Sequence, residues 1–187
     1  MNEQILFYFI IGVVILLTIG FIISIFNKII FLKNNVEKSF ANIDVVLKQR
    51  ADEIPNLIAV VKESKNYEAK TLEQLAKLRT QYYNASSSDE KVIVTNQLDK
   101  SLKSVILVAE NYPILRANNN FMAFQQRITQ LEDIIADRRE FFNDSVNLYN
   151  IGIQEFPNLI MAKLFSFKQK QMLQVTDNEK KYDGVKF

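Results

Sequence analysis

Acidic side chains are the main groups in this chain that could support catalysis or bind a metal ion. Three close pairs stand out along the sequence: Asp52/Glu53, Glu132/Asp133 and Asp137/Glu140. Carboxylates can ligate hard metal ions or exchange protons with a substrate. The chain has no His and no Cys, which excludes histidine catalysis, thiol chemistry and zinc sites built from these ligands. It also lacks a glycine-rich phosphate loop and a nucleophile elbow. Solvated helix faces therefore explain the acidic pairs best, and we expect neither enzyme activity nor a cofactor.

Two arginines occupy positions where the surrounding pattern is apolar. Arg50 and Arg138 each interrupt a long stripe of hydrophobic residues. A buried arginine needs carboxylate partners, because the loss of its hydration is otherwise very unfavourable. Asp52, Asp137 and Glu110 could supply them, and we predict a structural polar layer of these five residues that fixes the register of the helices. The alternative is that both guanidinium groups reach past the stripe into solvent.

Long helices are predicted to position these arginines. Steps of three and four residues, which keep side chains on one helix face, connect two sets of residues. The first set is Val36, Phe40, Ile43, Leu47, Arg50, Ile54, Leu57 and Val61. The second set is Phe121, Phe124, Ile128, Leu131, Ile135, Arg138, Phe142, Ser145 and Tyr149. Two shorter helices over about 68–83 and 88–110 lie between them. Four helices with short loops predict an all-α, antiparallel up-down-up-down bundle over residues 28–152.

Three prolines are predicted to interrupt the helices. Pro55 either kinks the first long helix or begins a new helix that Asp52 caps. Pro113 ends the third helix, because the residue before proline is disfavoured in helical geometry. Pro157 is expected to begin another helical segment, since proline is tolerated in the first turn.

The N-terminal residues 1–27 are predicted to be a transmembrane anchor that continues directly into the first long helix. Residues 5–26 carry no charge and would extend about 33 Å, enough to cross a hydrocarbon core of roughly 30 Å. The length of this segment and the lack of a small-residue cleavage site favour a retained anchor over a signal peptide. Lys28, Lys33 and Lys38 follow the segment, whereas no basic side chain precedes it. The positive-inside rule then predicts a single-pass protein of the cell membrane with its N-terminus outside and its bundle in the cytoplasm.

Residues 153–170 are predicted to return to the membrane, because an even number of helical passes ends where the bundle began. Apolar and basic residues are mixed in this segment: Phe156, Leu159, Ile160, Leu164, Phe165 and Phe167 with Lys163 and Lys168. This mixture is typical of a helix that lies in the membrane interface. The alternative is that the segment packs against the open end of the bundle. Residues 171–187 are polar and are expected to form a flexible tail.

The charge balance restricts the choice of partners. The 23 basic and 21 acidic residues leave a net charge of +2, which gives no general attraction for nucleic acid. No small-molecule substrate is indicated. The expected partners are the lipid bilayer, further copies of the chain and a membrane protein.

The sequence resembles the LemA family in several blocks. Residues 43–58 resemble its signature I-D-V-x-L-K-x-R-x-D-x-I-P-N-L, and residues 110–118 resemble its second block, E-x-Y-P-x-L-x-A-N. Residues 138–150, 156–158 and 185–187 resemble the remaining blocks, so that the likeness covers nearly the whole chain.

This resemblance implies a single-span bacterial membrane protein with a helical-bundle domain and no defined biochemical activity. A relative in magnetosome-forming bacteria is implicated in membrane organisation, which suggests a structural role. The leading hypothesis is a non-enzymatic, membrane-anchored helical scaffold that self-associates and organises membrane or membrane proteins. The first alternative is a cytoplasmic adaptor or accessory subunit of one membrane enzyme or transporter. The second is a hydrolase with a carboxylate-bound metal ion.

Overall fold

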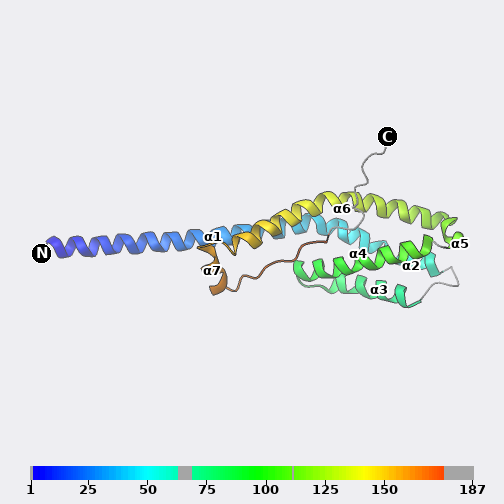
Figure 1. Ribbon diagram of the computed structural model, residues 1–187, viewed down its shortest axis with the longest axis horizontal. Helices are drawn as coiled ribbons and strands as arrows, with labels where there is room; N and C mark the ends of the chain where they lie inside the picture. Colours follow the sequence, from blue (N-terminus) through cyan, green and yellow to red (C-terminus); the bar gives the residue numbers. More distant parts are fainter. Residues whose placement is uncertain (1, 63–68, 111, 175–187) are drawn as a thin grey trace, which may run out of the picture. The chain divides into compact units, whose positions relative to one another are not determined.

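The computed structural model describes residues 2–62, 69–110 and 112–174, without the side chains at 2, 108–110, 114 and 116. In these residues the chain forms helices and no strand (Figure 1). The helices are α1 (Asn2–Asp52), α2 (Ile54–Lys62), α3 (Ala69–Asn84), α4 (Ser88–Glu110), α5 (Pro113–Arg116), α6 (Asn119–Gly152) and α7 (Asn158–Leu164). The predicted all-α class is confirmed.

Two compact units share the long helices α1 and α6. Unit 1 holds residues up to 37 together with residues 145–170, and unit 2 holds residues 38–144 together with the described residues after 170. The two longest helices each contribute one part to either unit. The predicted segments 1–27, 28–152, 153–170 and 171–187 stay predictions.

Unit 2 is a bundle in which neighbouring long helices alternate in direction. The rings of Phe40 in α1 and Phe142 in α6 lie 5.6 Å apart between their centroids. Farther along α1, Arg50 donates a hydrogen bond to Glu132, which lies earlier in α6. These two contacts show that α1 and α6 run antiparallel, as the paired stripes predict.

The shorter helices complete the bundle of unit 2. Tyr82 in α3 donates a hydrogen bond to the Asp44 carboxylate in α1 at 2.5 Å, whereas Arg79, earlier in α3, donates to the later Ala51 carbonyl at 3.1 Å. α3 is therefore antiparallel to α1, and it packs beside α4 (Figure 1). The four passes through α1–α2, α3, α4 and α6 have the predicted up-down-up-down order.

The core of unit 2 follows the predicted stripe of the first long helix. All eight side chains of that stripe are buried, from Val36 at the end of unit 1 to Val61 in α2. The stripe on α6 is buried as well, except at Arg138, which is exposed, and at Ser145, which is half-buried.

Prolines and an N-cap serine define the helix ends. α1 ends at Asp52 and α2 begins at Ile54, so Pro55 lies in the first turn of a new helix. Pro113 occupies the first turn of α5. At the start of α4, the Glu90 amide donates to Ser87 Oγ at 3.2 Å and the Glu90 carboxylate accepts from the Ser86 amide at 2.8 Å. Ser87 is therefore the N-cap of α4.

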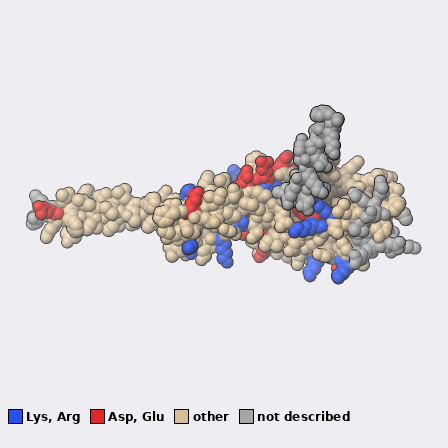
Figure 2. Space-filling view, viewed as in Figure 1, with Lys and Arg blue, Asp and Glu red and all other residues tan. Residues whose placement is uncertain are grey.

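Unit 1 contains the apolar first half of α1. The large side chains from Ile5 to Ile23 are 39–71% exposed, and Figure 2 shows this stretch as a run of uncharged surface. By length and composition it lies in the one helix of the described residues that could cross a membrane. A core helix of a soluble protein would have these side chains buried, so their exposure favours contact with lipid.

Candidate functional site

The most deeply buried charge of the described residues is the guanidinium group of Arg50, which lies in unit 2. Arg50 is 1% exposed. Its Nη1 donates a hydrogen bond to Glu132 Oε1 at 2.7 Å, and its Nη2 pairs with Asp99 Oδ1. Because α1, α4 and α6 each supply one of these groups, the ion pairs connect three helices of the bundle.

A second arginine, Arg139 of α6, belongs to the same cluster. It is 3% exposed, and its Nη2 lies 3.9 Å from Glu132 Oε2. Glu132 therefore lies between two buried guanidinium groups. We call Arg50, Asp99, Glu132 and Arg139 the arginine cluster. It resembles the predicted polar layer in position, but it contains different residues.

The predicted members other than Arg50 lie elsewhere. Arg138 is exposed and donates a hydrogen bond to the carbonyl of Asn42 at 2.6 Å. Asp52 is exposed, accepts a hydrogen bond from Tyr83 and lies 3.7 Å from Arg79. Asp137 is exposed as well. The side chain of Glu110 lies outside the described part of the chain.

The choice of Arg138 was wrong because the stripe can be followed in two ways. Steps of three and then four residues from Ile135 lead through Arg138, whereas steps of four and then three lead through Arg139. The structure follows the second path, which also makes Val146 buried in place of Ser145. Sequence spacing alone does not distinguish these adjacent arginines, because either path keeps a helical period.

Burial and neighbouring charges change the protonation equilibria of the arginine cluster. Burial raises the pKa of Asp99; the positive charge of Arg50 opposes this rise, and the negative charge of Glu132 adds to it. Burial alone would lower the pKa of Arg50, but Asp99 and Glu132 together raise it above its usual value. Arg50 is thus firmly cationic, and Asp99 is the group of this pair that takes up a proton at acid pH.

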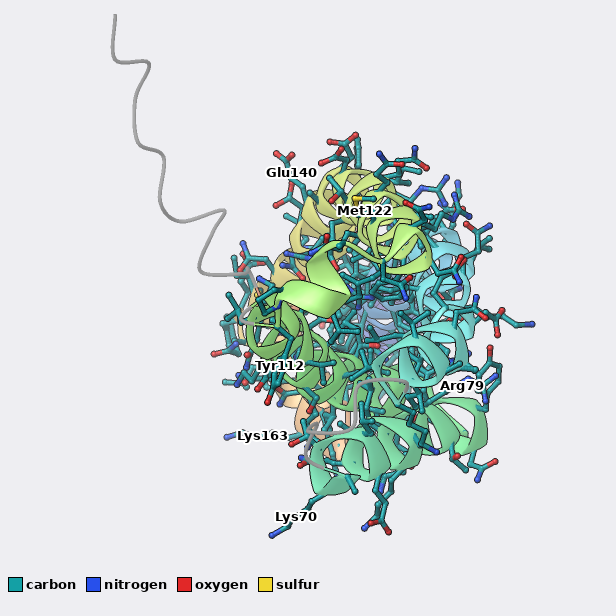
Figure 3. The ribbon with its side chains drawn as sticks, turned by 90° about the vertical axis from the view of Figure 1, so that its right-hand side faces the viewer. Lys70, Arg79, Tyr112, Met122, Glu140 and Lys163 are labelled. Carbon is teal, nitrogen blue, oxygen red and sulfur yellow. The ribbon has the colours of Figure 1, made fainter. Side chains whose placement is uncertain are left out.

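The acidic pairs of the sequence do not gather into a site for a metal ion. Within the described residues, no group of three or more carboxylates lies close enough to hold one. Glu132 is engaged by arginines, whereas Asp52, Asp133, Asp137 and Glu140 are exposed. Figure 3 shows Glu140 pointing away from the helices. The arrangement in unit 2 is thus one of ion pairs between helices.

The second candidate site is α7, which lies in unit 1. It has a polar side chain on its buried face and apolar side chains on its exposed face. Its buried positions are Asn158 and Ala162. The Asn158 side chain donates a hydrogen bond to the Gly152 carbonyl at 2.8 Å, which ties α7 to the end of α6. Ile160 and Leu164 lie one turn apart and are exposed. The outward face of α7 is therefore apolar, whereas a polar side chain lies on the inward face.

The end of α7 contacts the end of the uncharged segment of α1. The Phe26 ring centroid lies 4.9 Å from that of Phe165 and 6.1 Å from that of Phe167. Ser166, between them, has φ 55°, and the amide of Phe167 donates to the Ala162 carbonyl at 2.9 Å. This is the hydrogen bond of a Schellman motif, in which a left-handed residue ends the helix. It allows both rings to contact Phe26.

The predicted interfacial residues fall into two groups. Phe156, Ile160, Leu164 and Phe165 are 52–82% exposed, whereas Leu159 and Phe167 are half-buried. Lys163 and Lys168 are exposed, and Figure 3 shows Lys163 pointing outward. Lys28, the first basic residue after the apolar segment, pairs with Glu155 at 3.6 Å. α7 thus presents apolar and basic side chains beside the end of the span. Pro157 immediately precedes α7 and occupies its N-cap position.

Comparison with known proteins finds similarity to magnetosome proteins. The chain is similar to two magnetosome proteins of Paramagnetospirillum magneticum, MamQ 1 and MamQ 2, with 30% identity over 74 residues, or 40% of this chain and 27% of each relative. It is 29% identical over 69 residues to magnetosome protein MamQ of Magnetospirillum gryphiswaldense, covering 37% of this chain and 25% of that protein. The chain thus spans about a quarter of the length of these relatives. The apolar helix of unit 1 and the similarity to magnetosome proteins indicate membrane association.

A family model gives a broader match. The model of the LemA family matches residues 39–187, which include all of the described part of unit 2 except Lys38. The chain therefore belongs to the LemA family.

Proposed function

We propose that this protein is a non-enzymatic, membrane-anchored helical scaffold that contacts the bilayer through both α1 and α7 and self-associates. The observation that carries the proposal is the exposed apolar face of α7 beside the end of the uncharged segment of α1. The N-terminus of the protein would lie outside the cell membrane and the bundle in the cytoplasm, in agreement with the lysines that follow the apolar segment.

Lipid contact explains the polarity of α7 better than packing in water does. Ile160 and Leu164 lie four residues apart on one face of α7, and Phe156, in the turn before the helix, is 82% exposed. The contact between Phe26 and Phe165 places the end of α7 beside the residue at which the uncharged segment of α1 ends. An interfacial helix has this arrangement, with its apolar side chains toward the acyl chains and its lysines at the headgroups.

A structural role also agrees with the charges of unit 2. The arginine cluster uses its charged groups for contacts between helices, which supports a structural role. On α6, Ile134 and Phe141 are both exposed and lie seven residues apart. Apolar side chains at heptad spacing are typical of surfaces that pack against another helix, which supports self-association.

The mass of the extracted particle tests the scaffold proposal. The full chain would be expressed alone, extracted from the membrane into polymer-bounded lipid discs and weighed by single-particle mass measurement. A scaffold is expected as a particle with several copies and no other protein. A particle with one copy, accompanied by one distinct membrane protein, would instead support the adaptor. A single copy without a companion would contradict self-association.

Variants of α7 test the lipid contact separately. Replacing Ile160 and Leu164 by aspartate should place two charges on the outward face and detach α7 from the bilayer, while α1 keeps the chain in the membrane. The matched control replaces the exposed Asn147 and Gln154 by aspartate. Limited proteolysis in liposomes should cleave near α7 in the first variant and spare it in the control. Equal cleavage of both variants would contradict contact between α7 and lipid.

A further inference from the structure

The described chain continues after α7 without helix or strand, and residues 171–174 are held within unit 2 by two asparagine side chains. We call these four residues the strap. Asn143 of α6 donates through Nδ2 to the Leu173 carbonyl at 2.9 Å and accepts through Oδ1 from the Leu173 amide at 3.0 Å. Asn96 of α4 donates to the Met172 carbonyl at 3.2 Å and accepts from the Gln174 amide at 2.9 Å.

These four hydrogen bonds all reach backbone atoms of the strap. A side-chain amide offers a donor and an acceptor side by side, which is the same pair of groups that the edge of a β-strand offers an extended peptide. Leu173 is 3% exposed, whereas Met172 and Gln174 are exposed. The site thus recognises an extended backbone without regard to most side chains, and it accommodates one large aliphatic residue.

The same device occurs in unit 1. Asn150 donates to the Lys170 carbonyl at 3.0 Å and accepts from the Lys170 amide at 2.9 Å. This repeated use of an asparagine amide for paired backbone hydrogen bonds indicates that the chain is bound here as a peptide is bound by a receptor. The sequence predicted a flexible tail over residues 171–187, so the ordered contacts of the strap were not predicted.

Local opening of the strap breaks these four hydrogen bonds and exposes Leu173, whereas the contacts between the helices of unit 2 are kept. The hydrogen bonds of the strap replace bonds to water, and the ordering of a flexible segment opposes them, which leaves a small net gain. Segments with few buried contacts open locally far more often than a whole domain unfolds. The site of Asn96 and Asn143 then becomes accessible to another extended peptide.

We propose that the site formed by Asn96 and Asn143 binds the strap of a second copy of this chain. This proposal rests on the self-association proposed above, and it names the contact that links the copies. The strap of the chain itself is the occupant seen to fit the site, and a second copy offers the identical segment. Exchange of an identical element needs no new contact surface, and confinement to one membrane raises the local concentration of straps.

Two variants with complementary defects test the exchange in the full chain. The donor carries Asn96→Ala and Asn143→Ala, which disable its site, and Gln174→Cys at the end of its strap. The acceptor carries Leu173→Asp, which disables its strap, and Lys100→Cys one turn from Asn96. Because the natural chain has no cysteine, each variant has a single thiol. A short bis-maleimide linker is then added to the membranes, and the two variants carry tags of different mass.

A cross-linked donor–acceptor pair is expected from co-expressed variants and should be lost when either variant is expressed alone. Adding Asn96→Ala to the acceptor should abolish the pair, whereas adding the matched control Asn147→Ala, at an exposed position of α6, should leave it unchanged. Circular dichroism of each purified variant shows whether its helices are retained.

The outcomes separate this proposal from the scaffold proposal. If the wild-type chain extracts as a particle of several copies but the variants give no cross-linked pair, or a pair that Asn96→Ala leaves unchanged, strap exchange is wrong and self-association stands. If the wild-type chain extracts as a single copy, both proposals are wrong.

Discussion

Replacement of Arg50 by methionine should destabilise the bundle strongly at neutral pH. Methionine fills part of the space but leaves the buried Asp99 carboxylate without the positive charge of Arg50. Glu132 also loses the hydrogen bond that Arg50 donates. Breaking a buried ion pair by removing one partner costs about 3–5 kcal/mol. For a chain of this size, about 2–4 °C of melting temperature is lost per kcal/mol. The expected decrease is therefore roughly 6–20 °C, measured by circular dichroism of the full chain in detergent.

The loss should become smaller at acid pH. Burial raises the pKa of Asp99, and in this variant the opposing charge of Arg50 is gone, so the pKa rises further. A carboxyl group with a raised pKa binds more protons in the folded chain than in the unfolded one, so stability increases as the pH falls through the folded pKa. Melting curves at pH 7 and pH 5 should therefore show a smaller difference from wild type at the lower pH.

Two further variants make the comparison specific. Arg50→Met combined with Asp99→Leu removes the uncompensated charge and should recover much of the lost stability, since apolar replacement of a buried ion pair is often neutral. Arg138→Met removes an exposed arginine of α6 and should cost about 1 kcal/mol or less. If Arg50→Met melts within a few degrees of Arg138→Met at both pH values, the arginine cluster does not stabilise the bundle as described.

Three other predictions concern helix ends and topology. Ser87→Ala removes the N-cap acceptor of α4 and should cost about 1 kcal/mol; equal melting of variant and wild type at neutral pH would disprove this role. Asn158→Ala should cost about 1–3 kcal/mol of local stability. Amide hydrogen exchange in residues 153–165 should then be faster than in a Gln154→Ala control. Unchanged exchange would show that the hydrogen bond to the Gly152 carbonyl is dispensable. Lys77→Cys should resist a membrane-impermeant thiol reagent in intact cells and react after lysis, and labelling of intact cells would reverse the proposed topology.

Much of the fold could be predicted because apolar spacing is a strong signal in long helices. The buried stripe from Val36 to Val61 follows the predicted positions. The break at Pro55 and the start of α4 at Ser87 also depend on local chemistry that a sequence shows. The short helix α5 was not predicted, since a single turn after a proline has no periodicity to detect.

The partners of Arg50 could not be predicted, because they depend on tertiary contacts. Asp99 is the residue after the buried Leu98, and Glu132 is the residue after the buried Leu131, so both lie at the border of an apolar stripe. The sequence marks such border positions weakly, and it favoured Asp52 only because Asp52 is close to Arg50 along the chain. The strap was missed for a similar reason, since asparagine side chains that bind a distant backbone have no local pattern.

The depth of α7 in the bilayer tests most directly whether the chain returns to the membrane. An environment-sensitive probe would be attached to Leu164→Cys in the full chain, reconstituted into liposomes with quencher-labelled lipids, and compared with probes on Ile23→Cys in the apolar segment and on Lys77→Cys in α3. We predict that lipid quenchers reduce the Leu164 and Ile23 signals strongly and leave the Lys77 signal unchanged. A Leu164 probe that only a water-soluble quencher reaches, as at Lys77, would contradict the second membrane contact.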